Sequence, residues 1–126
     1  MTKPETITID DQKYIRADSI HKDAEKLDGM QYCVIRSYGA GVFCGYLKEK
    51  VSEANGINVD LVNSRRIYYW SGACSISQLA VDGLQDIDNS KIAMVVPVQT
   101  VANVIEIIPM TEKASKQIQG ATAWKR

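Results

Sequence analysis

Two strand-like segments joined by glycines constrain the fold of this chain more than any other feature. Residues 32–38 and 42–47 are rich in β-branched and aromatic side chains, which favour strands. The tripeptide Gly-Ala-Gly at 39–41 lies between them, and glycine reaches the positive φ angles of a tight turn without steric cost. With Gly45, these glycines resemble a dinucleotide-binding loop, but a strand follows where that loop needs a helix. We therefore predict an antiparallel β-hairpin.

Most of the remaining chain also predicts strands, with two short helices among them. Further strand-like runs occupy residues 57–62, 65–70, 91–98 and 101–108. Ser75 and Gln78 have the spacing of a capping box, in which each side chain satisfies a free backbone N–H, and Gly83 can end that helix. Thr111 can cap a last short helix that closes at Gly120. Runs of strands broken by single helices predict an α+β fold, a compact antiparallel sheet with short helices.

The start of the chain is more polar and predicts a separate N-terminal arm. Residues 7–16 have the pattern of two short strands around an Asp-Asp turn. Residues 18–27 begin with N-cap chemistry and predict a short polar helix, which an Asp-Gly pair then stops. We therefore divide the chain into an arm over residues 1–29 and a single α+β ligand-binding domain over residues 30–126.

Charge and composition argue against several classes of partner. Fifteen Lys and Arg residues balance fifteen Asp and Glu residues, so no net field draws the molecule to nucleic acid or an anionic membrane. No apolar run approaches the ~20 residues of a membrane span, and the first residues lack the apolar segment of a signal peptide. Cys33, Cys44 and Cys74 lack a Cys-x-x-Cys spacing and fit reduced thiols. We expect a cytoplasmic protein that binds neither membrane nor nucleic acid.

Residues that could catalyse a reaction or hold a metal are sparse. His21 is the single histidine and lies among charged residues on the predicted arm helix, where a solvated position is the simpler interpretation. The three cysteines have no histidine near them in the sequence and fit small buried side chains. We therefore expect no catalytic residues, no metal, no cofactor and no enzymatic activity, although a mechanism that uses carboxylates alone stays open.

The segment over residues 63–72 is the richest in binding chemistry. Arg65 and Arg66 precede Tyr68, Tyr69 and Trp70 within a few positions. Guanidinium groups match phosphate oxygens in pairs, and aromatic faces stack on nucleobases. Strand alternation predicts Arg66, Tyr68 and Trp70 on one face, with Arg65 and Tyr69 on the other. The alternative is a strand whose rings fill the core and whose arginines pair with acidic neighbours.

A second basic cluster lies near the C-terminus. It comprises Lys113, Lys116, Lys125 and Arg126, and Trp124 stands beside the last two. Such residues often form a frayed tail. The alternative is a tail that folds over a ligand or over a neighbouring subunit.

Several stretches of the chain resemble a small domain family of phages and prophages. Residues 34–47 resemble its first hairpin, and residues 63–83, with the run Arg-Arg-Ile-Tyr-Tyr-Trp-Ser-Gly, resemble its central signature. Residues 105–114 are similar to its closing strand and helix, and residues 7–20 to a leader often found before it. The resemblance spans nearly the whole chain.

This family in turn resembles the phage anti-defence sponges of the Thoeris type. The resemblance implies a homo-oligomer with pockets at its subunit interfaces. These pockets would bind a cyclic ADP-ribose isomer, a signal made by a bacterial TIR enzyme, and sequester it without cleavage. Cyclic oligonucleotides would be further ligands. The region before the last helix has no arginine here, so Lys113 or the C-terminal pair 125–126 would have to supply that phosphate contact.

Residues and resemblance together predict a binding protein that sequesters a cyclic signalling nucleotide. The expected ligand-binding residues are Arg65, Arg66, Tyr69, Trp70, Ser71, Lys113, Trp124 and Arg126. A different class stays open, a protein–protein interaction module or inhibitor that binds a host protein through the same surface, because Tyr, Trp and Arg dominate such contacts. Nucleic-acid binding and enzymatic activity rank behind these two functions.

Overall fold

A computed structural model of the protein describes residues 8–9, 12–13, 22–54 and 56–124. Its strands are β1 (Thr8–Ile9), β2 (Gln12–Lys13), β3 (Gln31–Ser37), β4 (Gly41–Glu53), β5 (Gly56–Tyr69), β6 (Lys91–Ile92), β7 (Val96–Val101) and β8 (Val104–Pro109). Its helices are α1 (Ile76–Asp82), the 3-10 helix η2 (Ile87–Asn89) and α2 (Glu112–Gln119). Within these residues, no helix is long and apolar enough to cross a membrane.

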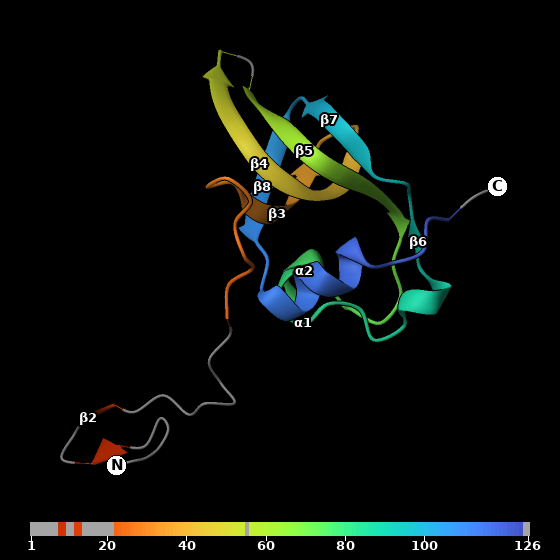
Figure 1. Ribbon diagram of the computed structural model, residues 1–126. Helices are drawn as coiled ribbons and strands as arrows, with labels where there is room; N and C mark the ends of the chain where they lie inside the picture. The colour runs from red at the N-terminus through yellow and green to blue at the C-terminus, as the bar shows by residue number, and fades with distance from the viewer. Residues whose placement is uncertain (1–7, 10–11, 14–21, 55, 125–126) are drawn as a thin grey trace.

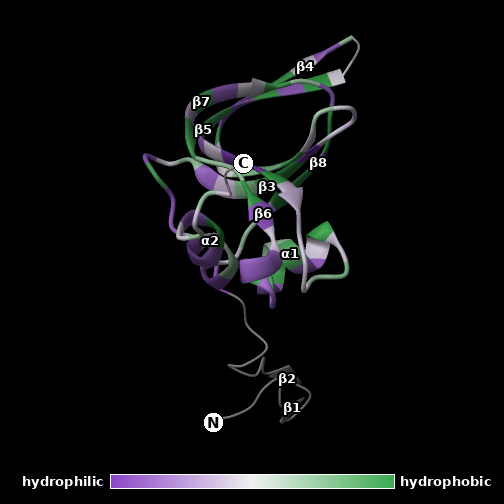
Figure 2. Cartoon of the chain, turned by 90° about the vertical axis from the view of Figure 1, so that its right-hand side faces the viewer, coloured by the Kyte–Doolittle hydropathy of each residue, from purple (hydrophilic) through white to green (hydrophobic). Residues whose placement is uncertain are grey.

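The main sheet is antiparallel and strongly curled. Its strand order is β6-β5-β4-β3-β8, and β7 also pairs with β5. Ala102 and Asn103 join β7 to β8, and the Ser37 hydroxyl on β3 donates to the Ala102 carbonyl (2.6 Å). The two ends of the sheet therefore approach each other, and the strands enclose a ring when seen from the side (Figure 2). The fold is mainly β, a curled antiparallel sheet with two short helices, rather than an even mixture of helix and sheet.

Both faces of the central strands are buried. On β3, Cys33 and Ile35 point into the curl, whereas Tyr32 and Val34 point toward the helices. The inner core comprises Cys33, Ile35, Phe43, Val59, Leu61, Val101 and Val104. The helix-side core includes Tyr32, Val34, Val42, Cys44, Ile67, Leu79, Ala80, Ile92, Ala114 and Ile118. Strands buried on both faces lose the simple apolar/polar alternation, which explains their long apolar runs in the sequence.

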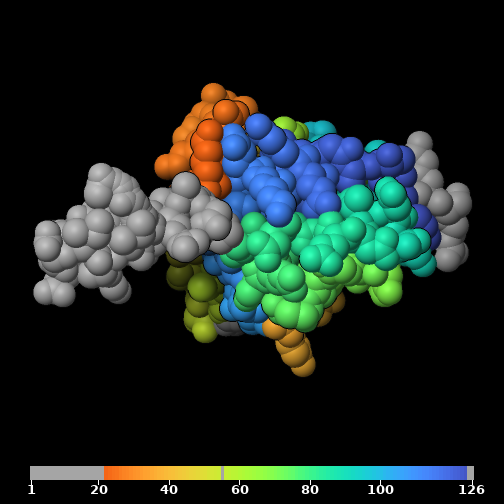
Figure 3. Space-filling view, turned by 90° about the horizontal axis from the view of Figure 1, so that it is seen from below, coloured from red at the N-terminus to blue at the C-terminus, as the bar shows by residue number. Residues whose placement is uncertain are grey.

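The two helices lie together below the sheet and cover one end of the molecule (Figures 1 and 3). The Ser75 hydroxyl accepts from the Gln78 N–H (3.2 Å), and Gly83 ends α1 with a positive φ of 78°, as predicted. The Thr111 hydroxyl accepts from the Ala114 N–H at the start of α2 and donates to the Val81 carbonyl oxygen of α1 (2.7 Å). One N-cap residue therefore also ties the two helices together.

β5 is one continuous strand with a bulge, not the two strands predicted over 57–62 and 65–70. Tyr46 pairs with Val62 but Cys44 pairs with Arg65, so β5 holds one more residue than β4 between these pairs. Asn63 adopts a left-handed φ of 51°, which Asn tolerates better than most residues. Opposite the bulge, a Cβ on Gly45 would lie 2.8 Å from the Cβ of Ser64, so only glycine fits there. The bulge turns Arg65 toward the helices.

Two boundaries near the C-terminal strands also differ from the prediction. The run 91–98 splits into β6 and β7, and the next turn lies at 102–103 instead of near residue 100. The Ala93 N–H still donates to the Arg66 carbonyl oxygen of β5 (2.8 Å), but the Ala93 carbonyl accepts from Arg65 Nε (2.8 Å), and the described pairing with β5 resumes at Val96. Pro97 lies on β7, an edge strand that pairs with β5, which is a position where sheets tolerate proline.

The N-terminal region is confirmed only in part. β1 and β2 form the predicted two-stranded pair, whereas the Asp-Asp turn and the first four residues of the predicted arm helix lie outside the described residues. The described end of that predicted helix, residues 22–27, is not helical. There the Ala24 N–H donates to the Met110 carbonyl oxygen (3.1 Å), and Lys22 accepts from the Glu112 N–H (2.7 Å). Pairing with the domain therefore outweighs the weak helix propensity of this short polar segment.

Candidate functional site

Arg65 is buried, and its guanidinium group is bonded to backbone carbonyls. Nε donates to Ala93 (2.8 Å), and Nη1 donates to Ile118 and Ala121 (both 2.7 Å). Two of these acceptors lie at the C-terminal end of α2, where the helix leaves carbonyls free and carries partial negative charge. Arg65 thus fastens α2 to the sheet. The sequence pattern predicted that Arg65 binds a phosphate group. Because Nε and Nη1 already donate to backbone carbonyls, these two nitrogens cannot also donate to a phosphate.

Arg66 lies on the other face of β5. Its guanidinium carbon stands 4.6 Å from the ring centroid of Phe43, a residue of the inner core. This geometry is a cation–π contact on a half-buried side chain. The two consecutive arginines therefore point to opposite sides of the sheet, and they cannot grip one phosphate group together within one chain.

The end of β5 presents two exposed tyrosines. Tyr68 and Tyr69 are 59% and 54% exposed, because a register shift lies between the Ile67–Ile92 and Tyr69–Lys91 pairs. The predicted alternation of side chains between the two faces of the strand over residues 66–70 is therefore wrong beyond Ile67. Trp70 is partly buried and packs on the helix-side core, whereas Tyr68 stays at the surface.

Trp124 folds back onto this tyrosine pair from the C-terminal tail. The backbone N–H of Trp124 donates to the Ile92 carbonyl oxygen (2.8 Å), and this bond holds the tail along β6. The ring centroids of Tyr68 and Trp124 are 5.7 Å apart with an edge-to-face angle of 63°, and Lys91 Nζ lies 5.1 Å from the Trp124 centroid. With Tyr69, these three residues line an open hollow of about 550 Å³, here named the aromatic hollow.

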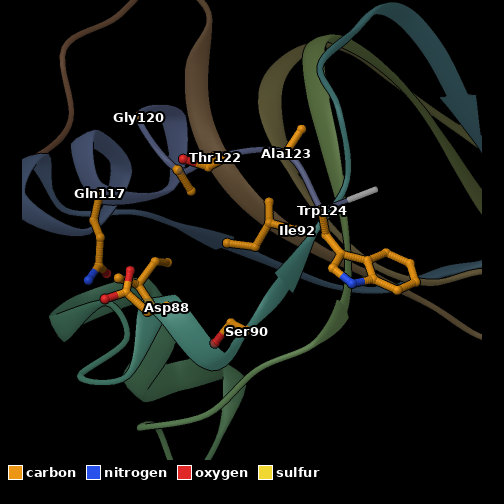
Figure 4. Close-up of a pocket in the computed structure, with 10 residues that line it drawn as sticks. Asp88, Ser90, Ile92, Gln117, Gly120, Thr122, Ala123 and Trp124 are labelled. Atoms are coloured by element: carbon orange, nitrogen blue, oxygen red, sulfur yellow. The ribbon is translucent and has the colours of Figure 1, made fainter. Parts of the chain in front are cut away.

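A second hollow of about 430 Å³, the tail hollow, lies on the other side of the tail and shares Trp124. Asp88 and Gln117 stand at one end of its lining and the indole ring at the other (Figure 4). The Gln117 side chain bonds to both backbone groups of Leu84, so it is committed to joining α2 to the loop after α1. Asp88 is exposed and adds negative charge. The tail hollow therefore favours hydroxyl or amine donors rather than phosphate.

The remaining predicted site residues lie elsewhere. The Ser71 hydroxyl donates to the Asp86 carboxylate (3.0 Å), which orders the loop before η2. Lys113 is exposed in the first turn of α2 and lines neither of these two hollows. Arg126 lies outside the described residues. Of the eight predicted residues, Tyr69 and Trp124 are thus the pair that the structure brings into one hollow.

Two residues of the aromatic hollow were missing from the predicted site. Tyr68 belongs to the run that the sequence singled out, but strict alternation grouped it with Trp70 instead of Tyr69. Lys91 stands more than 20 positions away and carries no motif of its own. Its pairing with Tyr69 across β5 and β6 brings it to the site. An edge-strand lysine is a common feature of sheets, so no sequence signal marked it as a ligand residue.

Two of the three cysteines are buried as predicted, whereas Cys74 is exposed, so the prediction of a buried thiol is wrong at that position. Cys33 and Cys44 are buried, and burial raises the pKa of the Cys33 thiol to about 11. Burial, with a smaller effect of Cys33, also raises the pKa of Cys44. Both groups are therefore protonated and unreactive at neutral pH. Among the described residues, no three His, Cys, Asp or Glu side chains cluster as metal ligands would.

Comparison with known proteins gives one match. A family model with the description "Domain of unknown function (DUF6948)" matches residues 30–118, which include β3 to β8 and most of α2. No curated protein and no solved structure matches this chain. The matched span includes the tyrosines and lysine of the aromatic hollow, and ends before Trp124.

Proposed function

This chain belongs to the DUF6948 family of domains of unknown function, and from its aromatic hollow we propose that it binds and sequesters a cyclic signalling nucleotide without cleaving it. The observation that carries the proposal is the gathering of Tyr68, Tyr69 and Trp124 around one ammonium group. Exposed apolar side chains that gather in one patch often mark a binding site, whereas single ones are common.

The rings supply the affinity for a nucleobase. A base that stacks on an aromatic side chain contributes about 1–3 kcal/mol. Trp124 and Tyr68 already meet edge to face, so the exposed faces of Trp124 and Tyr69 remain for a planar ligand. The tail that carries Trp124 is held by its bond to Ile92, which lowers the entropy lost on binding.

The charge supplies the preference for phosphate. Lys91 is exposed and lies at the edge of the aromatic hollow, which contains no carboxylate among its described lining residues. One ammonium group is a modest attraction for a diphosphate, and Arg65 is already committed to α2. Further cations must therefore come from the chain end or from a second subunit.

A second subunit would also close the aromatic hollow. The hollow is open on one side, and a cyclic dinucleotide-sized ligand has two faces to cover. A homo-oligomer with the aromatic hollow at its interface would enclose the ligand. The finer role, an anti-defence sponge of a phage that captures a cyclic ADP-ribose isomer, rests on the resemblance of residues 34–47 and 63–83 and forms part of this proposal.

Calorimetric titration tests the proposal. The protein is titrated with cyclic ADP-ribose isomers and with cyclic di- and trinucleotides, and linear ADP-ribose serves as the comparison ligand. We expect tight binding of a cyclic nucleotide, and mass spectrometry of the released ligand should return it unchanged. Consumption of the ligand would instead indicate an enzyme, and absence of binding to every nucleotide would contradict the proposal.

Matched variants locate the site. Trp124→Ala and Tyr69→Ala should weaken binding about tenfold or more, because each removes one stacking surface. Lys91→Gln should weaken it less and reduce its salt dependence. Tyr38→Ala is the control, since Tyr38 is 78% exposed in the β3–β4 turn and lines none of the hollows described here. Equal losses in all four variants would contradict the assignment of the site.

A protein–protein interaction module remains the second candidate function. Met94 and Val95 in the β6–β7 connection and Val98 on β7 are exposed as well. Tyr and Trp with exposed aliphatic neighbours are typical of contact hot spots. Met94→Ser would then abolish capture of a stoichiometric host protein and leave nucleotide binding unchanged. The reverse pattern would favour the nucleotide.

A further inference from the structure

A third hollow of about 390 Å³ lies beside the C-terminal end of α2. Its polar lining comes from Tyr32, Tyr46, Asn63, Arg65 and Gln119, and it is here named the tyrosine hollow. It shares no described lining residue with the aromatic hollow, so it is a separate place on the domain. The proposed function makes no use of it.

The hydroxyl of Tyr32 is the unusual group in this hollow. Tyr32 is fully buried, and among the described residues its hydroxyl is the one buried side-chain polar atom without a hydrogen-bond partner. The large majority of buried side-chain polar atoms in proteins have a hydrogen-bond partner. The Tyr32 ring meets the Tyr46 ring edge to face, with centroids 4.9 Å apart, so phenylalanine would serve equally well in packing. The hydroxyl therefore needs another explanation.

Arg65 supplies a donor beside it. Nε and Nη1 of Arg65 hold backbone carbonyls, and Nη2 has no hydrogen-bond partner among the described residues. Arg65 lines the tyrosine hollow and acts electrostatically on the Tyr32 phenol. The described lining contains this one cation and no carboxylate. An oxygen with negative charge that reaches both groups would satisfy the two donors.

The bulge of β5 opens this site. Asn63 has a left-handed φ of 51° and an exposed side chain at the mouth, next in the chain to the buried Ser64 and Arg65. Bulges often occur beside functional sites because they redirect side chains. Here the bulge turns the guanidinium group inward and leaves an amide at the rim. Leu27 and Val95 supply the apolar walls.

We propose that the tyrosine hollow binds a small organic oxyanion, whose charged oxygen accepts hydrogen bonds from the Tyr32 hydroxyl and Arg65 Nη2. Its short planar or apolar body packs against Leu27, Val95 and the Tyr46 ring. A carboxylate and a phosphate monoester both carry such an oxygen. The relative affinities of one compound of each kind show which of the two the hollow prefers.

Benzoate, phenyl phosphate and the neutral benzamide are the probes. Binding is followed by chemical shifts of the backbone amides of Tyr32, Tyr46 and Asn63 in the full chain. We expect the two anions to shift these resonances and benzamide to bind about tenfold more weakly. The stronger anion identifies the ligand as a carboxylate or a phosphate ester. Equal binding of benzamide, or no shift with any probe, would overturn the proposal.

Tyr32→Phe tests the hydroxyl directly. Since that hydroxyl has no partner in the free protein, the variant should fold with an unchanged or higher Tm. It should bind the preferred anion about five- to tenfold more weakly, while Tyr38→Phe binds it as the wild type does. Leu27→Trp, at a partly exposed position on the wall, should block binding without unfolding the domain. A clearly lowered Tm of Tyr32→Phe, or unchanged affinity, would show that the hydroxyl serves the fold alone.

Discussion

The two ends of a short stretch of β5 use similar residues for different purposes. At the inner end, Arg65 is 3% exposed and its charge is matched by carbonyls of α2 and of the β6–β7 connection. At the outer end, Tyr68 and Tyr69 are more than half exposed and touch little besides Trp124 and Lys91. A buried charge must be paired within the fold, so the bonds to these carbonyls occupy Nε and Nη1 of Arg65 and leave only Nη2 for a ligand. Exposed rings have no such requirement, so the outer end is the part of β5 that offers whole aromatic faces to a nucleotide.

Removal of the buried arginine is the strongest test of this contrast. Arg65→Ala should lower the free energy of unfolding by about 3 kcal/mol or more, because it leaves a cavity and unpaired carbonyls at the end of α2. Arg66→Ala should cost about 1 kcal/mol, the value of a half-buried cation–π contact. Urea denaturation of both variants measures the difference. Equal losses of unfolding free energy in the two variants would mean that Arg65 does not hold α2 on the sheet.

We expect the next largest loss of stability at the β5 bulge, where Gly45 approaches Ser64 closely. Gly45→Ala should destabilise the protein by about 1–3 kcal/mol, since its Cβ would lie 2.8 Å from Ser64 Cβ and 2.9 Å from Ser64 Cα. Gly120→Ala is a milder comparison, because the nearest atom to its Cβ is the Lys116 carbonyl oxygen at 3.2 Å. Thermal unfolding compares the two. A Gly45→Ala variant as stable as wild type would argue against the bulge.

Substitutions at the outer end of β5 should change the stability of the protein little. Tyr69→Ala is expected to change the free energy of unfolding by about 0.5 kcal/mol or less, as exposed substitutions usually do. The same variant should lose nucleotide affinity, and a loss of stability comparable to that of Gly45→Ala would place Tyr69 in the fold instead. Denaturation and titration on one sample separate the two effects.

The smallest expected effect lies on the surface of α2. Glu112 contacts Lys22 (3.4 Å) and Lys116 (3.5 Å). Desolvation raises the pKa of its carboxyl group, but the charges of the two lysines and their hydrogen bonds together outweigh it and hold the pKa below its ordinary value of 4.5. A depressed carboxyl pKa stabilises the fold above pH 4.5, and this contribution is lost as the pH falls through the lower folded value. Glu112→Gln should therefore lower Tm slightly at pH 7 and not at pH 3. A larger decrease at pH 3 than at pH 7 would reverse the sign and contradict the ion pairs.

Local chemistry predicted the elements that depend on a few neighbouring residues. The β3–β4 hairpin, the Ser75 cap of α1 and the Thr111 cap of α2 follow the sequence signals. The predicted arm helix failed over residues 22–27, where backbone bonds to Met110 and Glu112 form across most of the chain. Site prediction had the same limit, since it found Tyr69 and Trp124 but not Lys91.

By itself, the sequence determined that this protein is a small, strand-rich domain with two capped helices, and that its rings and cations gather in residues 63–72 and near the C-terminus. Caps, turns and strand preference act over a few residues, so they can be read along the chain. The tertiary structure alone decided which arginine is buried, which tyrosines face solvent and where the tail lies. The directions of these side chains depend on two register shifts, at each of which β5 has one residue more than its partner strand. The pairing of β5 with β4 and β6, which are distant in sequence from parts of it, sets where these shifts lie.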